Sequence, residues 1–523
     1  MIRRAMRAGV PLGLLAVLAL PALALAKGDG DSLGAYDKGA LVETTLINTL
    51  WVLVAAVLVL FMQAGFAMLE IGFSRQKNAG SGVAKILTNL SIAALAYWSV
   101  GFALAFGVDD SVSGLFGTDG FFLQDYEDAV PSQDLAEAGV VTGDPRAAFP
   151  VMGLSDASIE AKWLFQFAFC AVSLAIVWGT TLERIKYMAY VAYAVVFSAI
   201  IYPIGSHWVF GGGWLQESVG MQDFAGSTAV HLIGATGALA ALLLLGPRKN
   251  KFGPDRKPRA IPGHSMPLVG LGTIILFIGW FGFNAGSTLN VEDLRFAEVA
   301  VVTLLGGAGG VIGAFVATTV FQRTIDIGMV ANGMIGGLVG ITAPSGYVES
   351  WSAPIIGLVA GVIVVAGVLA IEKRLDDPVG ALSAHGLAGV WGTLSCGIFT
   401  SPRLAQYNAF GEESGGLWYS GSFAQLGHQA LGVVVVFTFV LTLSLVTFAL
   451  IKATIGLRVE DEAEDAGLDI VEHGMYGYPE QFIPLPEIGA ASHGPAAPGS
   501  FSNGAASPAP AGSRAMSTKE ATT

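Results

Sequence analysis

The sequence predicts an all-α integral membrane protein with eleven transmembrane helices. Of its 523 residues, 53% are hydrophobic and only 13% are charged, whereas soluble domains carry about 25% charged residues. Glycine is abundant, with 69 residues, and small residues allow helices to pack closely in lipid. Long apolar stretches also recur along the chain, each able to cross about 30 Å of hydrocarbon.

The N-terminal segment is expected to be removed rather than to remain in the membrane. Three arginines within the first seven residues precede an apolar stretch at 9–25, which ends in Ala24-Leu25-Ala26. This is the pattern of a signal peptide with an A-x-A cleavage site. We therefore expect residues 1–26 to be cleaved and Lys27 to begin the mature chain. An uncleaved anchor is the alternative.

The apolar stretches that follow define the spans. They lie at 46–70, 83–107, 162–182, 187–205, 224–246, 267–288, 297–320, 329–346, 353–372, 380–400 and 428–452. The signal peptide, these spans and the two segments that follow them divide the chain into four predicted regions. These are the signal peptide at 1–26, a transmembrane domain at 44–452, a cytoplasmic regulatory tail at 453–480, and a disordered Ala/Gly/Pro/Ser-rich tail at 481–523.

Loop charges orient the chain. The loops assigned to the inner side contain Arg75, Lys77, Arg184, Lys186, Arg248, Lys249, Lys251, Arg256, Lys257, Arg259, Arg323, Lys373 and Arg374. Between spans, the outer loops contain Arg146, Lys162, Arg295 and Arg403. Because Lys and Arg concentrate on cytoplasmic loops, we expect the mature N-terminus outside, the C-terminus in the cytoplasm, and a location in the cell (inner) membrane.

Acidic residues gather in the outer loop at 109–160 and in the tail. The loop is expected to be solvated; weak attraction of cations to the outer face is the alternative. The net charge of −13 and the lack of a large basic patch argue against a nucleic-acid partner. Cys170 and Cys396 are too few for a disulfide framework or a zinc site.

Two histidines inside predicted spans are the main functional signal. His231 follows Asp223 by eight residues, and His385 follows Asp377 by eight residues. Eight residues of helix reach about 12 Å into the membrane, and the two spans enter from opposite sides. Both rings should therefore lie near the midplane, and the five-span separation indicates an inverted five-helix repeat. Each aspartate is expected to cap its helix, with a substrate role as the alternative.

Histidines inside spans are functional candidates by default, and we expect this pair to line a pore rather than to pack inertly. Aromatic side chains lie toward the outer side of the predicted histidine depth. By helix rise, Phe169 lies about 10 Å inside the interface. The sixth span ends with Trp280, Phe283 and Ser287 in that order, with Ser287 near the outer surface.

These residues, taken with the sequence strings around them, resemble the ammonium transporter (Amt/Mep/Rh) family, in its bacterial Amt branch. The matching strings are FMQAGFAMLE (61–70), DFAGSTAVH (223–231), GWFGFNAGS (279–287), DDP (376–378) and SAHG (383–386), with GLRV (456–459), GLD (467–469) and EHG (472–474) in the tail. The similarity covers about 44–480 in order. It implies the ammonium-transporter fold, a homotrimer in the lipid bilayer, and one conduction pore in each subunit.

The resemblance also implies residue roles. Ser287, Phe169 and an aromatic residue after the fourth span would form the outer ammonium site, with Asp223 organising it from behind. Phe169 and Phe283 would form the pore gate, and Trp280, His231 and His385 would line the pore.

One position departs from the family pattern. Several bacterial members place Trp before the Gly-Gly-Gly of the outer loop, where this chain has Phe210. Trp208 could replace it only if the loop turned differently. Because Phe is a weaker cation–π partner than Trp, the affinity of the outer site depends on which residue completes it.

The residues suggest how such a pore would work. Aromatic faces and a hydroxyl replace part of the hydration shell of ammonium, each cation–π contact contributing roughly 0.5–2 kcal/mol. A bare cation in the apolar pore would cost on the order of tens of kcal/mol. We therefore expect deprotonation near the two phenylalanines and passage as ammonia along the histidines, with potassium rejected.

Alternatives from other classes stay open. The chain could be a membrane ammonium sensor that signals through its tail, or an Rh-like channel for ammonia or carbon dioxide. The tail could recruit a PII-type signalling protein or be merely solvated. An enzyme is not expected, because the sequence shows no nucleophile–base pair, phosphate-binding loop or metal cluster, and no cofactor is expected.

Overall fold

The computed structural model describes residues 43–108, 114–124, 157–291, 294–408 and 415–482. The predicted signal peptide, most of the acidic loop at 109–160 and residues 483–523 of the predicted tail lie outside these ranges. The chain divides into two units, residues 1–478 and 479–523. Within its described part, the second unit contains the short helix α21 (Pro479–Phe482).

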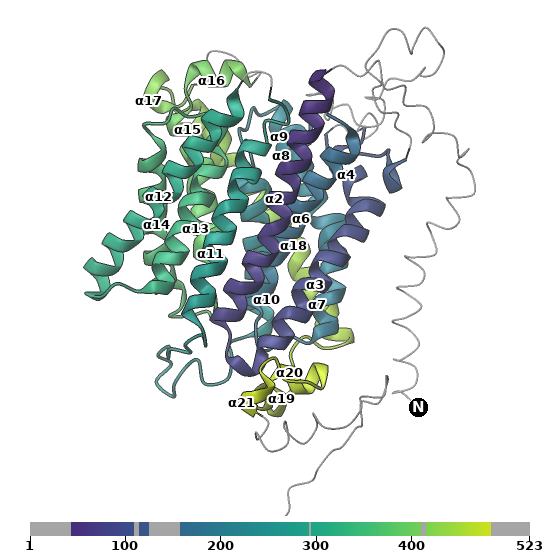
Figure 1. Cartoon of the computed structure of the whole chain (residues 1–523), viewed down its shortest axis with the longest axis vertical. Helices are drawn as coiled ribbons and strands as arrows, with labels where there is room; N and C mark the ends of the chain where they lie inside the picture. Colours follow the sequence, from purple (N-terminus) through teal and green to yellow (C-terminus); the bar gives the residue numbers. More distant parts are fainter. Residues whose placement is uncertain (1–42, 109–113, 125–156, 292–293, 409–414, 483–523) are drawn as a thin grey trace, which may run out of the picture. The chain divides into compact units, whose positions relative to one another are not determined.

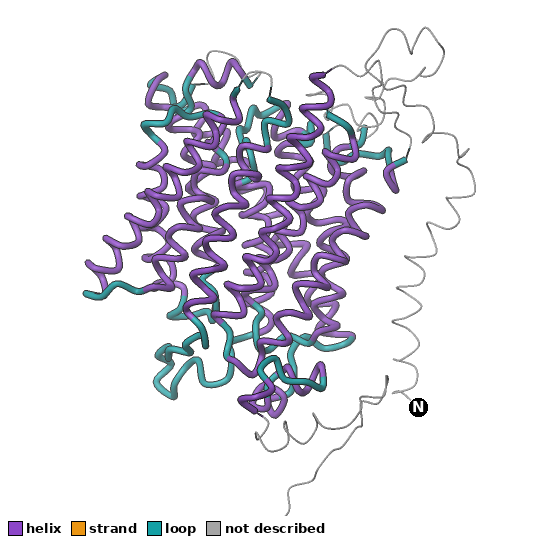
Figure 2. Tube along the Cα trace, in the orientation of Figure 1, coloured by secondary structure: helices purple, strands orange, loops and turns teal. Residues whose placement is uncertain are grey.

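The first unit is a bundle of long helices. They run side by side, and the connecting loops gather at the two ends of the bundle (Figures 1 and 2). No β-strand occurs in the described ranges, so the predicted all-α class is confirmed.

Each of the eleven predicted apolar stretches is helical. The first five correspond to α2 (Glu43–Phe73), α3 with η3 and α4 (Ala79–Ala96, Tyr97–Gly101 and Phe102–Phe106), α6 (Ile159–Thr180), α7 with η6 and α8 (Tyr187–Val196, Phe197–Ile201 and Tyr202–Phe210), and η7 with α10 (Ser227–Leu232 and Ile233–Leu245). The other six correspond to α11 with η8 (Met266–Trp280 and Phe281–Ala285), α12 (Arg295–Gln322), α13 (Ile327–Thr342), α14 (Ala353–Ile371), η10 with α15 (Leu382–Leu387 and Ala388–Phe399), and α18 (Ala424–Thr454).

Nine of these helices in the described residues are long and apolar enough to cross a membrane. The two others are α13, which has only 16 residues, and the helix that carries His385. Asp326 caps α13 at its start, where its carboxylate accepts a hydrogen bond from the backbone of Met329 at 3.0 Å, and Pro344 follows its end. The His385 helix is less apolar because its buried side includes Ser383, Thr393 and Ser395 as well as the histidine.

Glycine brings helices into contact, as the composition predicts. The helices α12 and α14 pack so closely that a Cβ on Gly357 would lie 1.9 Å from the carbonyl oxygen of Gly306. A Cβ on Gly361 would likewise lie 2.1 Å from the carbonyl oxygen of Gly310. Larger side chains at these positions would push the two helices apart.

Several spans contain a π-helical turn. Both candidate histidines lie in such turns, His231 in η7 and His385 in η10, and Phe283 lies in η8. A π turn widens the helix locally and often occurs at a functional site. The unusual backbone geometry therefore coincides with the residues that the sequence singles out.

Candidate functional site

His231 and His385 lie side by side in the interior. The two side chains come from η7 and η10, and the residues are 0% and 5% exposed. Their Nδ1 atoms are 3.2 Å apart, and the ring centroids are 5.2 Å apart with an interplanar angle of 23°. In such a contact between neutral rings, one Nδ1 donates and the other accepts. The pair then offers one Nε2 donor and one Nε2 acceptor to a small polar molecule.

Two aspartates fix the starts of the histidine helices. The Asp223 carboxylate accepts hydrogen bonds of 2.7–3.0 Å from the backbone amides of residues 226–229. The Asp377 carboxylate accepts bonds of 2.8–3.3 Å from the amides of Val379, Gly380 and Leu382. Burial raises the pKa of Asp223 to about 6, although its four backbone hydrogen bonds favour the ionised form.

Aromatic rings extend from the histidine pair. Phe169 and Phe283 are stacked, with centroids 4.0 Å apart and an interplanar angle of 16°. The ring of His231 lies 5.4 Å from that of Phe283 and 5.3 Å from that of Trp280. The four rings of Phe169, Phe283, His231 and His385 therefore form one continuous column, with Trp280 beside it.

Hydrogen bonds hold two further residues near this column. The Trp280 indole Nε1 donates to Thr342 Oγ1 at 2.9 Å, which fixes the ring orientation. The Ser287 hydroxyl donates to the carbonyl oxygen of Phe283 at 2.8 Å, and Ser287 is half-buried. Ser287 thus lies one helical turn from the stacked phenylalanine, on the side away from His231.

The two aromatic candidates after the fourth span have different surroundings. Phe210, at the end of α8, stacks on Phe106 with centroids 6.1 Å apart, and in the described residues no ring contact joins it to the column. Trp208 packs on Phe439 of α18, and its Nε1 donates to the carbonyl oxygen of Leu115 at 2.8 Å. Both aromatic side chains are thus engaged with neighbouring parts of the chain rather than with the column.

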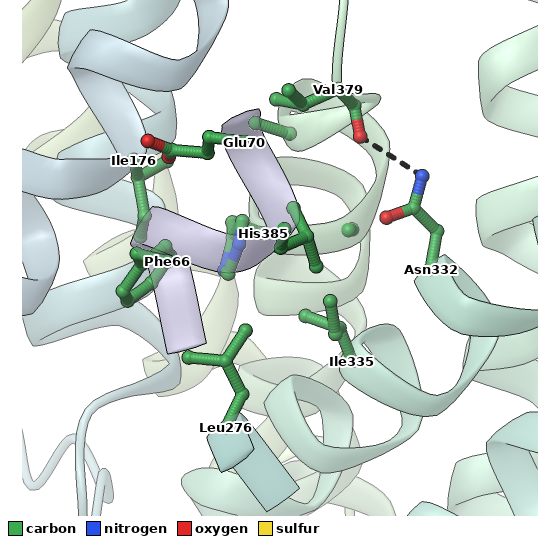
Figure 3. A pocket seen from close by; sticks show the side chains of 11 residues that line it. Phe66, Glu70, Ile176, Leu276, Asn332, Ile335, Val379 and His385 are labelled. Carbon is green, nitrogen blue, oxygen red and sulfur yellow. Dashed lines mark hydrogen bonds between the residues drawn. The ribbon is translucent and has the colours of Figure 1, made fainter. Parts of the chain in front are cut away.

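A cavity beyond His385 contains residues that the sequence analysis did not single out. It is lined by His385 together with Phe66, Glu70 and Asn332, among others (Figure 3). Glu70 entered only as part of the string at 61–70. The sequence could have marked Glu70 as a candidate, because it is the one acidic residue in the predicted span at 46–70. Ionisable residues in spans are functional candidates.

The tail is bound to the loop between α2 and α3 and to the start of α3. Its helices α19 (Asp461–Ala466) and α20 (Leu468–His473) lie at one end of the bundle (Figure 1). The Asp469 carboxylate accepts hydrogen bonds from the amides of Gly80 at 2.9 Å and Ser81 at 2.7 Å, which caps α3. Lys77 Nζ donates to the carbonyl oxygen of Glu464 at 2.7 Å.

A buried charge cluster connects the tail to the start of the His385 helix. Arg248 donates two side-chain hydrogen bonds to Asp376, both 2.9 Å long, and lies 3.6 Å from Glu183. Glu183 in turn pairs with Arg75, which lies 3.8 Å from Glu464 of the tail. Burial alone would raise the pKa of Asp376, but hydrogen bonds and charge from Arg248, with the charge of Arg184, lower it to about 2.

The described residues contain no group of three or more His, Cys, Asp or Glu side chains that could hold a metal ion. The chemistry of the site therefore rests on aromatic faces, one hydroxyl, two imidazoles and the buried Glu70.

Relatives with the same sequence pattern are transporters. A family model described as Ammonium Transporter Family matches residues 50–478. The chain is 41% identical over 443 residues to ammonium transporter Amt2 of Archaeoglobus fulgidus, a match that covers 83% of this chain and 88% of the relative. It is 34% identical over 441 residues to ammonium transporter 3 of Dictyostelium discoideum, covering 83% and 94%.

Solved structures of Amt and Mep proteins superpose on this chain. A protein described as Sensor Amt Protein superposes with a TM-score of 0.71 at 36% identity, covering 82% of this chain and 99% of that one. Mep2 of Candida albicans superposes with a TM-score of 0.69 at 27% identity, covering 80% and 87%. These matches confirm the predicted fold and the multi-pass membrane character. The chain belongs to the ammonium transporter family, whose members are channels or transporters and not enzymes.

Proposed function

We propose that each subunit recruits ammonium at an outer aromatic site, deprotonates it, and conducts ammonia through a pore lined by His231 and His385. The observation that carries this proposal is the continuous column of rings from the Phe169–Phe283 stack to the histidine pair. Ser287 begins the pathway, with Phe210 as the aromatic residue that completes the outer site and Asp223 holding the helix start behind it.

The order of these groups matches the chemistry of the substrate. Aromatic faces attract a cation, so ammonium gathers outside the phenylalanine gate. From the gate to His385 the column offers two imidazoles and no acidic side chain, so the uncharged form crosses it at far lower cost. The imidazole pair offers a donor and an acceptor to ammonia and can relay the released proton. Potassium has no proton to release and is rejected.

The experiment is ammonium-induced current on a solid-supported membrane, with wild type, His231→Ala and His385→Ala. We expect a current from wild type, and loss of flux or of selectivity against potassium in both variants. Unchanged flux and selectivity in both variants would overturn the twin-histidine role. Trp391→Phe, which removes an indole that donates to the carbonyl oxygen of Ile356 away from the column, serves as the control.

A membrane ammonium sensor is the second candidate. A solved relative that covers 82% of this chain is named a sensor, and in this chain the tail contacts the loops beside the His385 helix. Ammonium binding without current or ammonia uptake, together with a change in the tail's protease sensitivity, would favour this function over transport.

Assembly, topology and partners complete the proposal. We infer a homotrimer in the cell inner membrane, with the mature N-terminus outside after removal of residues 1–26 and the tail in the cytoplasm. The segment at 453–480 is then placed to meet a PII-type signalling protein. Truncation after Lys452 tests this role: an unchanged transport rate and nitrogen response would leave the tail without a regulatory function.

A further inference from the structure

Glu70 is a buried acid in a membrane span that the column of rings does not use. It lies on α2, close to the helix end at Phe73, and is 2% exposed. Its Oε2 atom has no hydrogen-bond partner among the residues that the structure describes. An unpartnered carboxyl group is costly in an apolar interior, and acidic residues inside membranes mark ion or proton pathways. A buried carboxyl oxygen without a hydrogen-bond partner therefore points to a ligand at this position.

Glu70 and His385 line the same cavity. The cavity has a volume of about 10 Å³, close to the space that one water-sized molecule needs. Figure 3 shows the Glu70 carboxyl group beside Ile176, with His385 among the other side chains that line the cavity. The other walls are mostly apolar and include Phe66, Leu69, Leu276 and Ile335. A ligand in this cavity therefore has few polar partners, and Glu70 is the one acid among them.

Two neighbours shape the polar part of the cavity. Asn332 Nδ2 donates to the carbonyl oxygen of Val379 at 2.9 Å, as the dashed line in Figure 3 marks, which leaves the amide oxygen as the acceptor. Gly179 makes room for the acid, because a Cβ there would lie 2.5 Å from Glu70 Oε1. The lining residues include neither Lys nor Arg within the described part of the chain. The cavity thus combines oxygen acceptors with an uncompensated acid.

We propose that this cavity is an inner binding site for one ammonium-class cation, with the Glu70 carboxylate as its counter-charge. The proposal rests on the proposed function: the pore delivers ammonia past His385, and the proton that the histidine pair relays protonates it to ammonium in the cavity. Ammonium is about the size of water and carries four donors, which suits a small cavity with oxygen acceptors. The Nδ1 atom of His385 is engaged with His231, so its Nε2 atom is the one left for the cavity.

The direct test is infrared difference spectroscopy on the full-length protein in membranes, exchanging ammonium chloride for potassium chloride at constant pH. We expect an ammonium-dependent change in a carboxylate band that disappears in Glu70→Gln. The control is Glu372→Gln, which removes a charge paired with Lys251 at 3.7 Å outside the cavity and should keep the band. A band that persists in Glu70→Gln would overturn the proposal.

Currents separate this proposal from the proposed function. A charge-assisted hydrogen bond supports an effect of about tenfold, so ammonium current should fall about tenfold in Glu70→Gln and less in Glu70→Asp. Equal currents in wild type and Glu70→Gln would mean that the group acts as a neutral acid, which overturns the cation site while transport stands. Absence of both current and ammonia uptake in wild type would instead overturn the proposed function. Unchanged thermal unfolding of the variant excludes misfolding as the cause of a lower current.

Discussion

Asp223 and Asp377 bind backbone amides at the starts of two different helices, and each lies eight residues before a buried histidine. In both helices the histidine lies in a π-helical turn. A carboxylate that fixes the helix start also fixes the depth of the ring that follows, about 12 Å along the helix. The 3.2 Å contact between the histidines therefore depends on two caps as well as on the packing around the rings.

Removing the second cap should disturb transport more than a cap elsewhere. In Asp377→Ala, three amides lose their acceptor, which should lower the free energy of unfolding by about 1–2 kcal/mol. The ammonium current should fall as well, because His385 is no longer held against His231. Asp326→Ala is the matched control, since Asp326 caps α13 and its loss should cost similar stability while the current remains. Full current in Asp377→Ala would show that the cap does not position the histidine.

Much of the site could be predicted because it depends on spacing along single helices. The equal eight-residue offsets of His231 and His385 predict equal depth in opposed spans, and the structure brings the rings together. Spacing along one helix could not place Glu70 in the same cavity as His385, because that depends on the tertiary arrangement of α2 and η10, which no local pattern encodes. The π-helical turns also went unpredicted, because a membrane span that is apolar on most faces has no periodic pattern in which an extra residue would show.

The Arg248–Asp376 pair should contribute stability that acid removes. The folded pKa of Asp376 is about 2, below an unfolded value of about 3.9, so its contribution is present above pH 4 and is lost as the pH falls toward 2. Asp376→Asn should therefore cost about 3 kcal/mol at pH 7, measured by thermal or denaturant unfolding. The difference from wild type should shrink between pH 4 and pH 2.

The exposed pair of Asp255 and Lys257 is the control for that measurement. Its side chains are 58% and 81% exposed, and exposed ion pairs contribute little to stability. Asp255→Asn should therefore unfold like wild type at every pH. A constant cost of Asp376→Asn from pH 7 to pH 2 would mean that the buried pair contributes through packing rather than through charge.

Asp469 should control whether the tail stays bound. Its carboxylate accepts from the amides of Gly80 and Ser81 and also from Gly477 at 3.0 Å. In Asp469→Ala these donors lose their acceptor, so limited proteolysis should cut the tail several times faster than in wild type. Glu462→Ala changes an exposed acid on the neighbouring helix and should leave the cleavage rate unchanged. Equal rates for all three proteins would show that other contacts hold the tail.

The aromatic residue at position 210 should set the apparent affinity for ammonium. Trp is a better cation–π partner than Phe, and a gain of about 0.5–1 kcal/mol corresponds to roughly a two- to fivefold change. Phe210→Trp should therefore lower the half-saturating ammonium concentration of the current by about that factor. Trp208→Phe is the control, because Trp208 packs on Phe439 and bonds to Leu115, and it should leave this concentration unchanged. A shift in Trp208→Phe without one in Phe210→Trp would assign the outer site to Trp208, and it would require the loop to adopt a different turn when ammonium binds.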